Sequence, residues 1–356
     1  MTSFLQLPGI LPELIKENRS RATGAGLDPY AYERVTAGLT SLHDWPDAFR
    51  GAGRGHIAAA EHSEALGHRV SAGESYQVAA RWFHYAVLLP HPDRATAALA
   101  AAEADDAMRR ALALLDPRAE RVEAPGLFAG WLRTPAGTDR PPVVVVVPGL
   151  DSSKEEFHGV TEALLRRGVA TFTMDGPGQG VLAGSTAPEA DYHRVLRRVI
   201  DALERRPGVD ASRTGVIGLS LGGFYAAVSA AHEPRIRATA TVSGPYRIDW
   251  DELTPYVIDT LALRSGSPDA AREFVARLDL SGIAERIVSP LRVIDGGQDS
   301  IPGVTNGESL AREAPGGEYL LVPHGDHLLG NARADWLPST ADWLIQQLTQ
   351  APKRHM

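Results

Sequence analysis

Ser220 lies in a setting that suits a nucleophile. It occurs in Gly218-Leu219-Ser220-Leu221-Gly222-Gly223, directly after the β-type run 214–217 and directly before the apolar helical run 224–228. A sharp turn from a strand into a helix exposes a serine hydroxyl, and glycines two residues before and after it let the chain pack where a Cβ would collide. The same pattern occurs by chance in glycine-rich turns, but its position between a strand and a helix favours a nucleophilic serine.

Two backbone amides are expected to stabilise an oxyanion beside this serine. A helix that begins at Leu221 directs unpaired N–H groups at the site, so the Leu221 amide is the first predicted donor. The second donor is expected from the loop at 148–151, which follows the valine run 143–147. We predict that it is the amide of Leu150, with that of Asp151 as the alternative.

An acid and then a histidine are required after a serine of this kind in the chain. Asp299 lies a few residues beyond the strand-like run 291–294, in a loop that can approach the serine. Asp295 is the alternative, but its place at the strand end itself suits a carboxylate that braces the loop. We therefore predict Asp299 as the acid.

The base is predicted in the loop after the last strand-like run, which has the sequence Pro323-His324-Gly325-Asp326-His327. His324 is nearer the strand, whereas the Gly-x-His spacing and the position farther into the loop favour His327. In this arrangement the imidazole takes the serine proton, and the carboxylate fixes the ring's tautomer and stabilises its charged form.

Strand-like runs that alternate with helical segments predict the scaffold for these residues. The runs end in turns rich in Gly, Pro, Asp or Ser, and they cover residues 143–147, 170–174, 214–218, 238–243, 291–295 and 319–322. This alternation is typical of an α/β fold with a mostly parallel, doubly wound sheet. Five consecutive valines at 143–147 indicate a central strand that is buried on both faces.

The N-terminal third has a different pattern, in which apolar residues recur at helical spacing from about residue 11 to 115. We predict an all-helical N-terminal cap domain at 1–120 and a catalytic domain at 121–352, with a helical insertion at about 245–289. Ser71 and Glu74 are placed to form a capping box at the start of a helix that carries Tyr76 and Tyr85.

Composition excludes several classes of function. The chain has 356 residues, a formal net charge of −8 and no cysteine, which argues against nucleic-acid partners, disulfides and thiolate zinc sites. Its twelve histidines form no metal-binding pattern. No signal peptide and no membrane-spanning run are apparent. We expect a cytoplasmic protein that acts on a small molecule without a metal, and that binds neither nucleic acid nor a membrane.

Four stretches resemble a specific group of enzymes. They are Ser71-Ala72-Gly73-Glu74 with the helix that follows, residues 149–156, residues 175–180, and the turn around Ser220. Together they resemble the 2,6-dihydroxypseudooxynicotine hydrolase family of α/β hydrolases, which are carbon–carbon bond hydrolases with relatives that shorten polyketide pigments.

The resemblance implies an α/β-hydrolase fold with an N-terminal helical cap, a homodimer and no cofactor. It also implies a triad at Ser220, Asp299 and His327, and substrates in which an acyl group is cut from an aromatic or polyketide fragment. The chain departs from some relatives in having no carboxylate at 243–246, after the strand that follows the nucleophile helix.

The leading hypothesis is therefore hydrolysis at a carbonyl, most simply of a ketone or β-diketone carbon–carbon bond through an acyl-enzyme. The alternatives are an ester or lactone hydrolase and an acyl-transferring cyclase, since the same triad serves all of them. A non-catalytic binding protein on this scaffold is disfavoured because all three triad residues are present. Four aromatic residues are predicted to line the pocket, namely Tyr246, Trp250, Trp82 and Tyr85.

Overall fold

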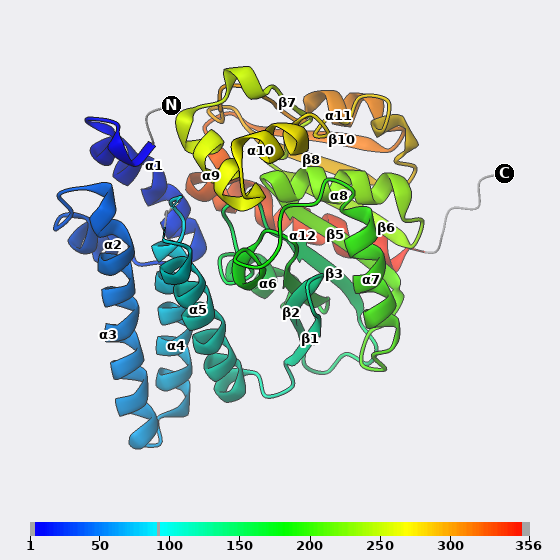
Figure 1. The fold of residues 1–356 in the computed structure, drawn as a ribbon. Helices are drawn as coiled ribbons and strands as arrows, with labels where there is room; N and C mark the ends of the chain where they lie inside the picture. The colour runs from blue at the N-terminus through cyan, green and yellow to red at the C-terminus, as the bar shows by residue number, and fades with distance from the viewer. Residues whose placement is uncertain (1–3, 91–92, 351–356) are drawn as a thin grey trace.

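An eight-stranded sheet forms the centre of the molecule. The computed structural model describes residues 4–90 and 93–350 (Figure 1). The strands lie in the order β1-β2-β4-β3-β5-β6-β8-β10. Their bounds are Glu120–Ala124 (β1), Phe128–Arg133 (β2), Pro142–Val147 (β3), Ala170–Asp175 (β4), Asp210–Leu219 (β5), Ile236–Val242 (β6), Leu291–Gly296 (β8) and Gly317–Val322 (β10). The six strands from β4 to β10 are parallel, and only β1 and β2 are antiparallel to their neighbours, which confirms the predicted fold class.

The valine run occupies the middle of this sheet, as predicted. Val143–Val147 are completely buried, and successive side chains belong to two different hydrophobic clusters because a strand alternates its faces. One face packs on α7 (His193–Glu204) and α8 (Leu221–His232), and the other on α6 (His158–Leu165) and α12 (Arg333–Thr349). A short helix, α11 (Glu308–Glu313), precedes β10.

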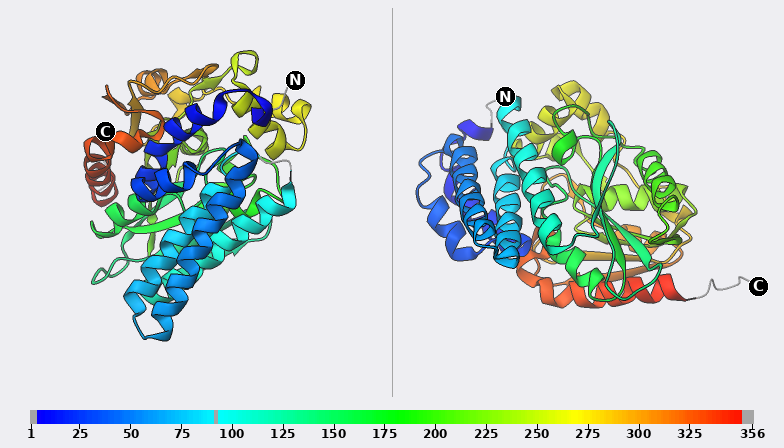
Figure 2. Two further views of the ribbon diagram at one scale, coloured as in Figure 1. Left: turned by 90° about the vertical axis from the view of Figure 1, so that its left-hand side faces the viewer. Right: turned by 90° about the horizontal axis from the view of Figure 1, so that it is seen from below.

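Five helices precede the sheet and pack along one side of it, as Figures 1 and 2 show. They are α1 (Ile10–Ala25), α2 (Pro29–Thr36), α3 (Trp45–Ala65), α4 (Arg69–Ala86) and α5 (Arg94–Leu115). Their core is aromatic: Trp45 stacks on Phe49 with a centroid distance of 4.3 Å, and Phe49 contacts Trp82 at 5.4 Å. Within the described part of the chain, no helix is long and apolar enough to cross a membrane.

The predicted helix start at Ser71 is wrong. Helix α4 begins at Arg69, and no side chain caps it. The tight turn from α3 decides this, because Gly67 adopts φ +77° there and the backbone N–H of His68 bonds back to the carbonyl of Ser63. The pattern of Ser71 and Glu74 therefore falls inside the first turns of a helix that has already begun.

The segment predicted as a helical insertion contains α9 (Pro255–Ser265) and α10 (Pro268–Val275), together with a short 3-10 helix, η4 (Trp250–Glu252). A small two-stranded sheet, β7 (Arg247–Ile248) with β9 (Val304–Thr305), lies beside them. Helix α9 contacts the loop after β3 and the segment after α4, since Tyr256 donates hydrogen bonds to Asp151 at 2.5 Å and to the Leu88 carbonyl at 3.2 Å. The domain boundaries themselves stay predictions.

A buried lysine joins the helices to the sheet. Lys154 Nζ lies 2.7 Å from Asp175 at the end of β4, 2.8 Å from Glu155 and 3.0 Å from Asp105 on α5. Its side chain is almost completely shielded from solvent. Burial alone would lower the pKa of Lys154, but the surrounding carboxylates outweigh it and raise the pKa well above the usual value.

Replacing Lys154 tests how much this ion cluster stabilises the contact between the helices and the sheet. In Lys154→Met the carboxylates of Asp175, Glu155 and Asp105 lose a common cation, so we expect the free energy of unfolding at neutral pH to fall by about 3–5 kcal/mol. Urea denaturation of the variant and of the native protein measures this difference in the free energy of unfolding. The loss should shrink in acid, where protonated carboxyls need no cation. Arg109→Met, in an exposed pair with Asp106, is the control and should change stability by less than about 1 kcal/mol. Equal stability of Lys154→Met and the native protein would contradict this account.

Candidate active site

Ser220 occupies a strained turn between β5 and α8. Its backbone has φ 55° and ψ −130°, a conformation that a residue with a side chain adopts only when the surrounding structure imposes it. The flanking glycines allow this turn, because a Cβ on Gly218 would lie 1.9 Å from the Gly222 carbonyl oxygen. One on Gly222 would lie 2.2 Å from the carbonyl oxygen of Val147 in β3. The packing of the turn on the central strand thus holds the serine in place.

The structure brings the three predicted polar residues into one hydrogen-bonded chain. His327 Nε2 lies 3.0 Å from Ser220 Oγ, and His327 Nδ1 lies 2.9 Å from Asp299 Oδ2. Asp299 comes from the loop after β8, and His327 opens a 3-10 helix, η6 (His327–Ala332), after β10. Three separate loops at the carboxyl edge of the sheet therefore supply this arrangement.

The electrostatics of His327 and Asp299 fit a base and its orienting acid. Burial alone would lower the pKa of His327, but the charge and hydrogen bond of Asp299 prevail and raise it above the usual value. Burial alone would raise the pKa of Asp299, and here the interaction with His327 prevails and lowers it. Asp299 is thus held as a carboxylate that accepts the Nδ1–H, which leaves Nε2 free to accept a proton from Ser220.

The two alternative residues lie elsewhere. His324 is largely exposed and contacts Asp335 at 3.2 Å on the surface. Asp295 is buried and accepts the backbone N–H of Gly307 at 2.9 Å, so it braces the loop that precedes α11. Burial raises the pKa of Asp295 to about 6. Neither residue belongs to the chain of hydrogen bonds at Ser220.

Ser243 is a site residue that the sequence analysis missed. It directly follows β6, has φ 50°, and its Oγ accepts the backbone N–H of Leu328 at 2.9 Å. A hydrogen bond from Ser243 also helps to lower the pKa of Asp299. Ser243 therefore holds both the acid and the residue that follows His327. The only signal in the sequence is its place at the end of a strand-like run beside Gly244 and Pro245.

The loop after β3 lies directly against Ser220. A Cβ on Gly149 would come within 2.9 Å of the Ser220 Cβ, so this position tolerates no side chain. Leu150 follows, while Leu221 opens α8 and its amide has no carbonyl acceptor in the preceding turn. The two amides predicted as oxyanion donors thus lie on the two segments that flank the serine.

A cluster of buried charges fixes this loop and was not predicted as part of the site. Arg21 on α1 contacts Asp151 with both terminal nitrogens at 2.9 and 3.0 Å, and its Nε contacts Glu156 at 2.6 Å. The other oxygen of Glu156 lies 3.1 Å from His84 Nε2, and His84 Nδ1 lies 3.0 Å from Ser153 Oγ. Helices α1 and α4 therefore position the loop that carries Leu150. Arg21 lies 130 residues from Asp151 in the chain, so no local pattern could reveal the contact.

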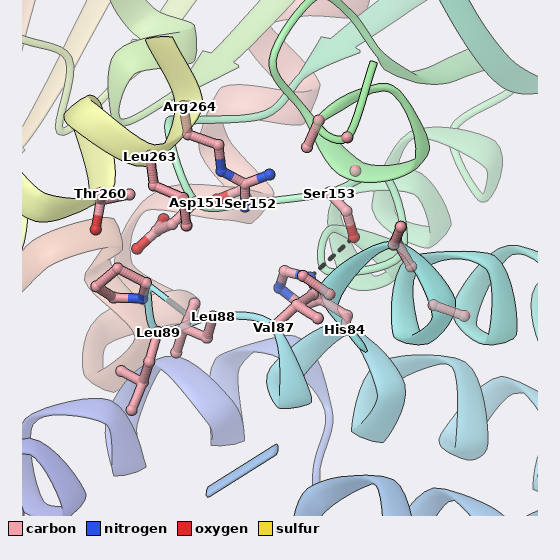
Figure 3. A pocket seen from close by; sticks show the side chains of 18 of the residues that line it. His84, Val87, Leu88, Leu89, Asp151, Ser152, Ser153, Thr260, Leu263 and Arg264 are labelled. Carbon is pink, nitrogen blue, oxygen red and sulfur yellow. Dashed lines mark hydrogen bonds between the residues drawn. The ribbon is translucent and has the colours of Figure 1, made fainter. Parts of the chain in front are cut away.

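A pocket opens beside Asp151, between the end of α4, the alanine face of α5 and helix α9 (Figure 3). Its empty volume is about 730 Å³, part of which is open solvent. The walls are mainly aliphatic, and the polar lining includes Asp151, Ser152, Ser153 and Arg264. Because Asp151 directly follows Leu150, the pocket begins next to the loop that faces Ser220. A pocket with these properties suits a small molecule.

None of the four aromatic residues predicted to line a pocket lines this one. Trp82 is buried in the core of the N-terminal helices. Tyr246 donates a hydrogen bond to Glu313 at 2.7 Å, and Trp250 packs against Arg272. Tyr85 is buried near the site, where Glu156 and Arg21 influence its pKa, but it does not line the pocket either. Aromatic character alone did not indicate whether a side chain points into the pocket or into the core, because buried rings also fill the core of the helical region.

No group of three or more histidine, aspartate or glutamate side chains is placed to hold a metal ion within residues 4–90 and 93–350. The acidic residues near Ser220 are instead occupied by protein cations. Asp151 and Glu156 contact Arg21, and Asp175 contacts Lys154.

The chain is similar to known hydrolases in sequence and in fold. The family described as esterase FrsA-like matches residues 55–271. The chain is 32% identical over 324 residues to 2,6-dihydropseudooxynicotine hydrolase of Paenarthrobacter nicotinovorans, which covers 87% of this chain and 86% of that protein. It is 32% identical over 269 residues to 20-hydroxy-prefusarin hydrolase of Gibberella moniliformis, covering 70% of this chain and 61% of that protein. The crystal structure of the 2,6-dihydroxy-pseudo-oxynicotine hydrolase is similar with a TM-score of 0.82 at 30% identity, covering 94% of this chain and 98% of that chain.

The likeness extends over both parts of the fold. The family match begins in α3 and ends in α10, so it includes α4, α5 and the strands β1 to β6, with the turn that carries Ser220. The chain therefore belongs to the FrsA-like family of α/β hydrolases and is a hydrolase related to 2,6-dihydropseudooxynicotine hydrolase.

Proposed function

We propose that this hydrolase cleaves a carbon–carbon bond next to a ketone, in an aromatic or polyketide-like small molecule, with Ser220, Asp299 and His327 as its catalytic triad. The observation that carries the proposal is the contact of His327 Nε2 with Ser220 Oγ at 3.0 Å, with Asp299 on the other ring nitrogen. The choice of bond is supported by the resemblance to a family of carbon–carbon bond hydrolases and by 32% identity to the pseudooxynicotine hydrolase.

The first half of the reaction forms an acyl-enzyme. Ser220 Oγ attacks the ketone carbon while His327 Nε2 takes its proton, and the amides of Leu221 and Leu150 stabilise the oxyanion. As the carbonyl reforms, the carbon–carbon bond breaks and its electron pair passes to the leaving carbon, as an enolate or an electron-rich ring. His327 returns the proton to that carbon, which releases the first product.

The second half of the reaction frees the serine. His327 takes a proton from water, the resulting hydroxide attacks the acyl ester on Ser220, and the proton returns to the serine oxygen. The second product is a carboxylic acid, so one water is consumed for each carbon–carbon bond broken. Asp299 holds the imidazole and stabilises its charged form in both halves.

Ester or lactone hydrolysis, or acyl transfer to a group of the substrate, is the second candidate. The FrsA-like family is described as one of esterases. The segment after β6 also supplies no carboxylate to the site, since Asp249 caps η4 and Asp251 contacts Arg272 on the surface. The homodimer implied by the resemblance and a cytoplasmic location stay predictions.

The choice between the two candidates can be made with a panel of substrates. We expect the purified protein to cleave an aryl 1,3-diketone to a carboxylic acid and a ketone, as followed by mass spectrometry. Ser220→Ala should lower kcat at least about 10³-fold, because it removes the nucleophile without changing the fold. Serine-dependent cleavage of an aryl ester or a lactone alone would favour the second candidate, and unchanged activity of Ser220→Ala would overturn the serine mechanism.

The pH profile tests the roles of His327 and Asp299. The base must be neutral to accept a proton, so kcat/KM should fall as the pH drops through the pKa of His327, with a midpoint above the ordinary value of 6.5. Asp299→Asn removes the carboxylate that raises this pKa, so burial prevails and the midpoint should move to lower pH. Activity should fall about 10³- to 10⁴-fold at the same time. A midpoint that stays in place in Asp299→Asn would contradict the assignment.

A further inference from the structure

The pocket beside Asp151 holds a cation without a partner. Arg264 lies in the last turn of α9, and Figure 3 shows its guanidinium extending from that helix into the pocket. Within the described residues the side chain makes no hydrogen bond and no ion pair, and its Nε is completely shielded from solvent. Burial lowers the pKa of Arg264, although the nearby charge of Asp151 acts in the opposite direction. An arginine nevertheless stays charged at neutral pH.

The carboxylates that line the pocket already have other partners. Asp151 is bound by Arg21 and by the Tyr256 hydroxyl, and Glu155 lies 2.8 Å from the ammonium of Lys154. Neither carboxylate therefore makes an ion pair with Arg264.

A second cation lines the same pocket. Arg94, at the start of α5, also lines the pocket and makes no ion pair with any described residue, and its charge contributes to the lowered pKa of Arg264. Two guanidinium groups without an ion pair among the described residues therefore line the pocket.

An unpaired and partly buried charge destabilises a folded protein, because the group loses its hydration without a compensating contact. Two other buried cations of this chain, Arg21 and Lys154, have carboxylate partners within 3.0 Å, and the buried Arg81 donates to the carbonyls of Gln77 and Ala25. No such partner meets Arg264 among the described residues, so its donors are available to a ligand. The forked donors of a guanidinium match the two oxygens of a carboxylate in one plane.

We propose that Arg264 binds a carboxylate of the substrate, so that this enzyme acts on molecules that carry a carboxylate in addition to the carbonyl at which they are cleaved. This inference rests on the proposed function, since it places the substrate in the pocket that begins beside the loop facing Ser220. The aliphatic walls of the pocket, formed by alanines of α5 and by Leu88 and Leu263, would contact the apolar part of such a molecule. Arg264 orients the substrate and takes no part in proton transfer.

Pairs of esters with and without a terminal carboxylate test the proposal. The substrates are the mono-4-nitrophenyl esters of adipate, pimelate and suberate, each compared with a neutral 4-nitrophenyl ester of equal chain length. We expect higher kcat/KM for at least one of the acidic esters than for its neutral partner. Arg264→Gln should lower kcat/KM for that acidic ester about 10- to 100-fold, mainly through KM, because a charge-assisted contact is lost. The neutral esters should change less than about twofold.

Two further variants serve as controls. Arg264→Lys keeps the charge but not the forked geometry, and should restore part of the preference for the acidic ester. Arg272→Gln removes one charge from an exposed ion pair on the neighbouring helix α10, and should leave both classes of ester unchanged. A structural role for Arg264 predicts a lower Tm of Arg264→Gln and equal losses for both classes of ester. That result, or the absence of any preference for an acidic ester, would overturn the proposal.

Direct binding separates this proposal from the proposed function. Hexanoate is titrated calorimetrically into Ser220→Ala and into the double variant Ser220→Ala with Arg264→Gln. Weaker binding to the double variant supports the carboxylate site, even if no ester is hydrolysed in a serine-dependent way. The opposite result is that hydrolysis depends on Ser220 while Arg264 contributes neither to hexanoate binding nor to the preference among esters. That result would support the proposed hydrolase and refute the carboxylate site.

Discussion

The ion cluster around Lys154 is the constraint on which the junction between the N-terminal helices and the sheet depends. One ammonium group lies within 3.0 Å of carboxylates from α5, from the end of β4 and from its own loop. A buried charge is tolerated only where its partners are in place, so the cluster requires these three segments to meet in one arrangement. The loop that contains Lys154 also contains Leu150 and Asp151. The helices are therefore part of the active-site architecture and not merely a cover over it.

Arg21 extends this constraint to the catalytic residues. It connects α1 to Asp151 and Glu156, and its charge and that of Asp151 both act on the pKa of His327. On the opposite side, Ser243 holds Asp299 and the backbone next to His327. The strained backbone of Ser220 persists because the sheet, the helices and these loops together leave it no alternative. Preorganisation of this kind fixes the donors and acceptors before a substrate arrives.

The distribution of charge distinguishes the reacting centre from the pocket beside it. Near Ser220, each cation and each carboxylate of the Arg21 cluster has a partner, which keeps the geometry rigid. In the pocket, Arg264 has none among the described residues, and the aliphatic walls strengthen its attraction for an anion by excluding water. The first arrangement suits chemistry on a carbonyl, and the second suits selection of the molecule that carries it.

Local sequence patterns were sufficient to predict the parts of this protein that depend on the conformation of a single strand or turn. The five valines of β3 and the glycines around Ser220 each reflect a requirement of a single strand or turn. The order of Ser220, Asp299 and His327 along the chain, each after a strand-like run, indicated the loops that supply them, so the fold class and these three residues were predictable. The start of α4 was not predictable, because Gly67 and the end of α3 decide it rather than Ser71.

Contacts between distant segments were decided only by the tertiary structure. The sequence favoured His327 and Asp299 over His324 and Asp295, but only the fold shows that His324 points to the surface and that Asp295 braces Gly307. The role of Arg21, the three carboxylates at Lys154 and the lone guanidinium of Arg264 have no local signature. Each depends on which charged residues come together where the helices meet the sheet. These residues are far apart in the sequence, so their spacing along the chain does not predict the contacts.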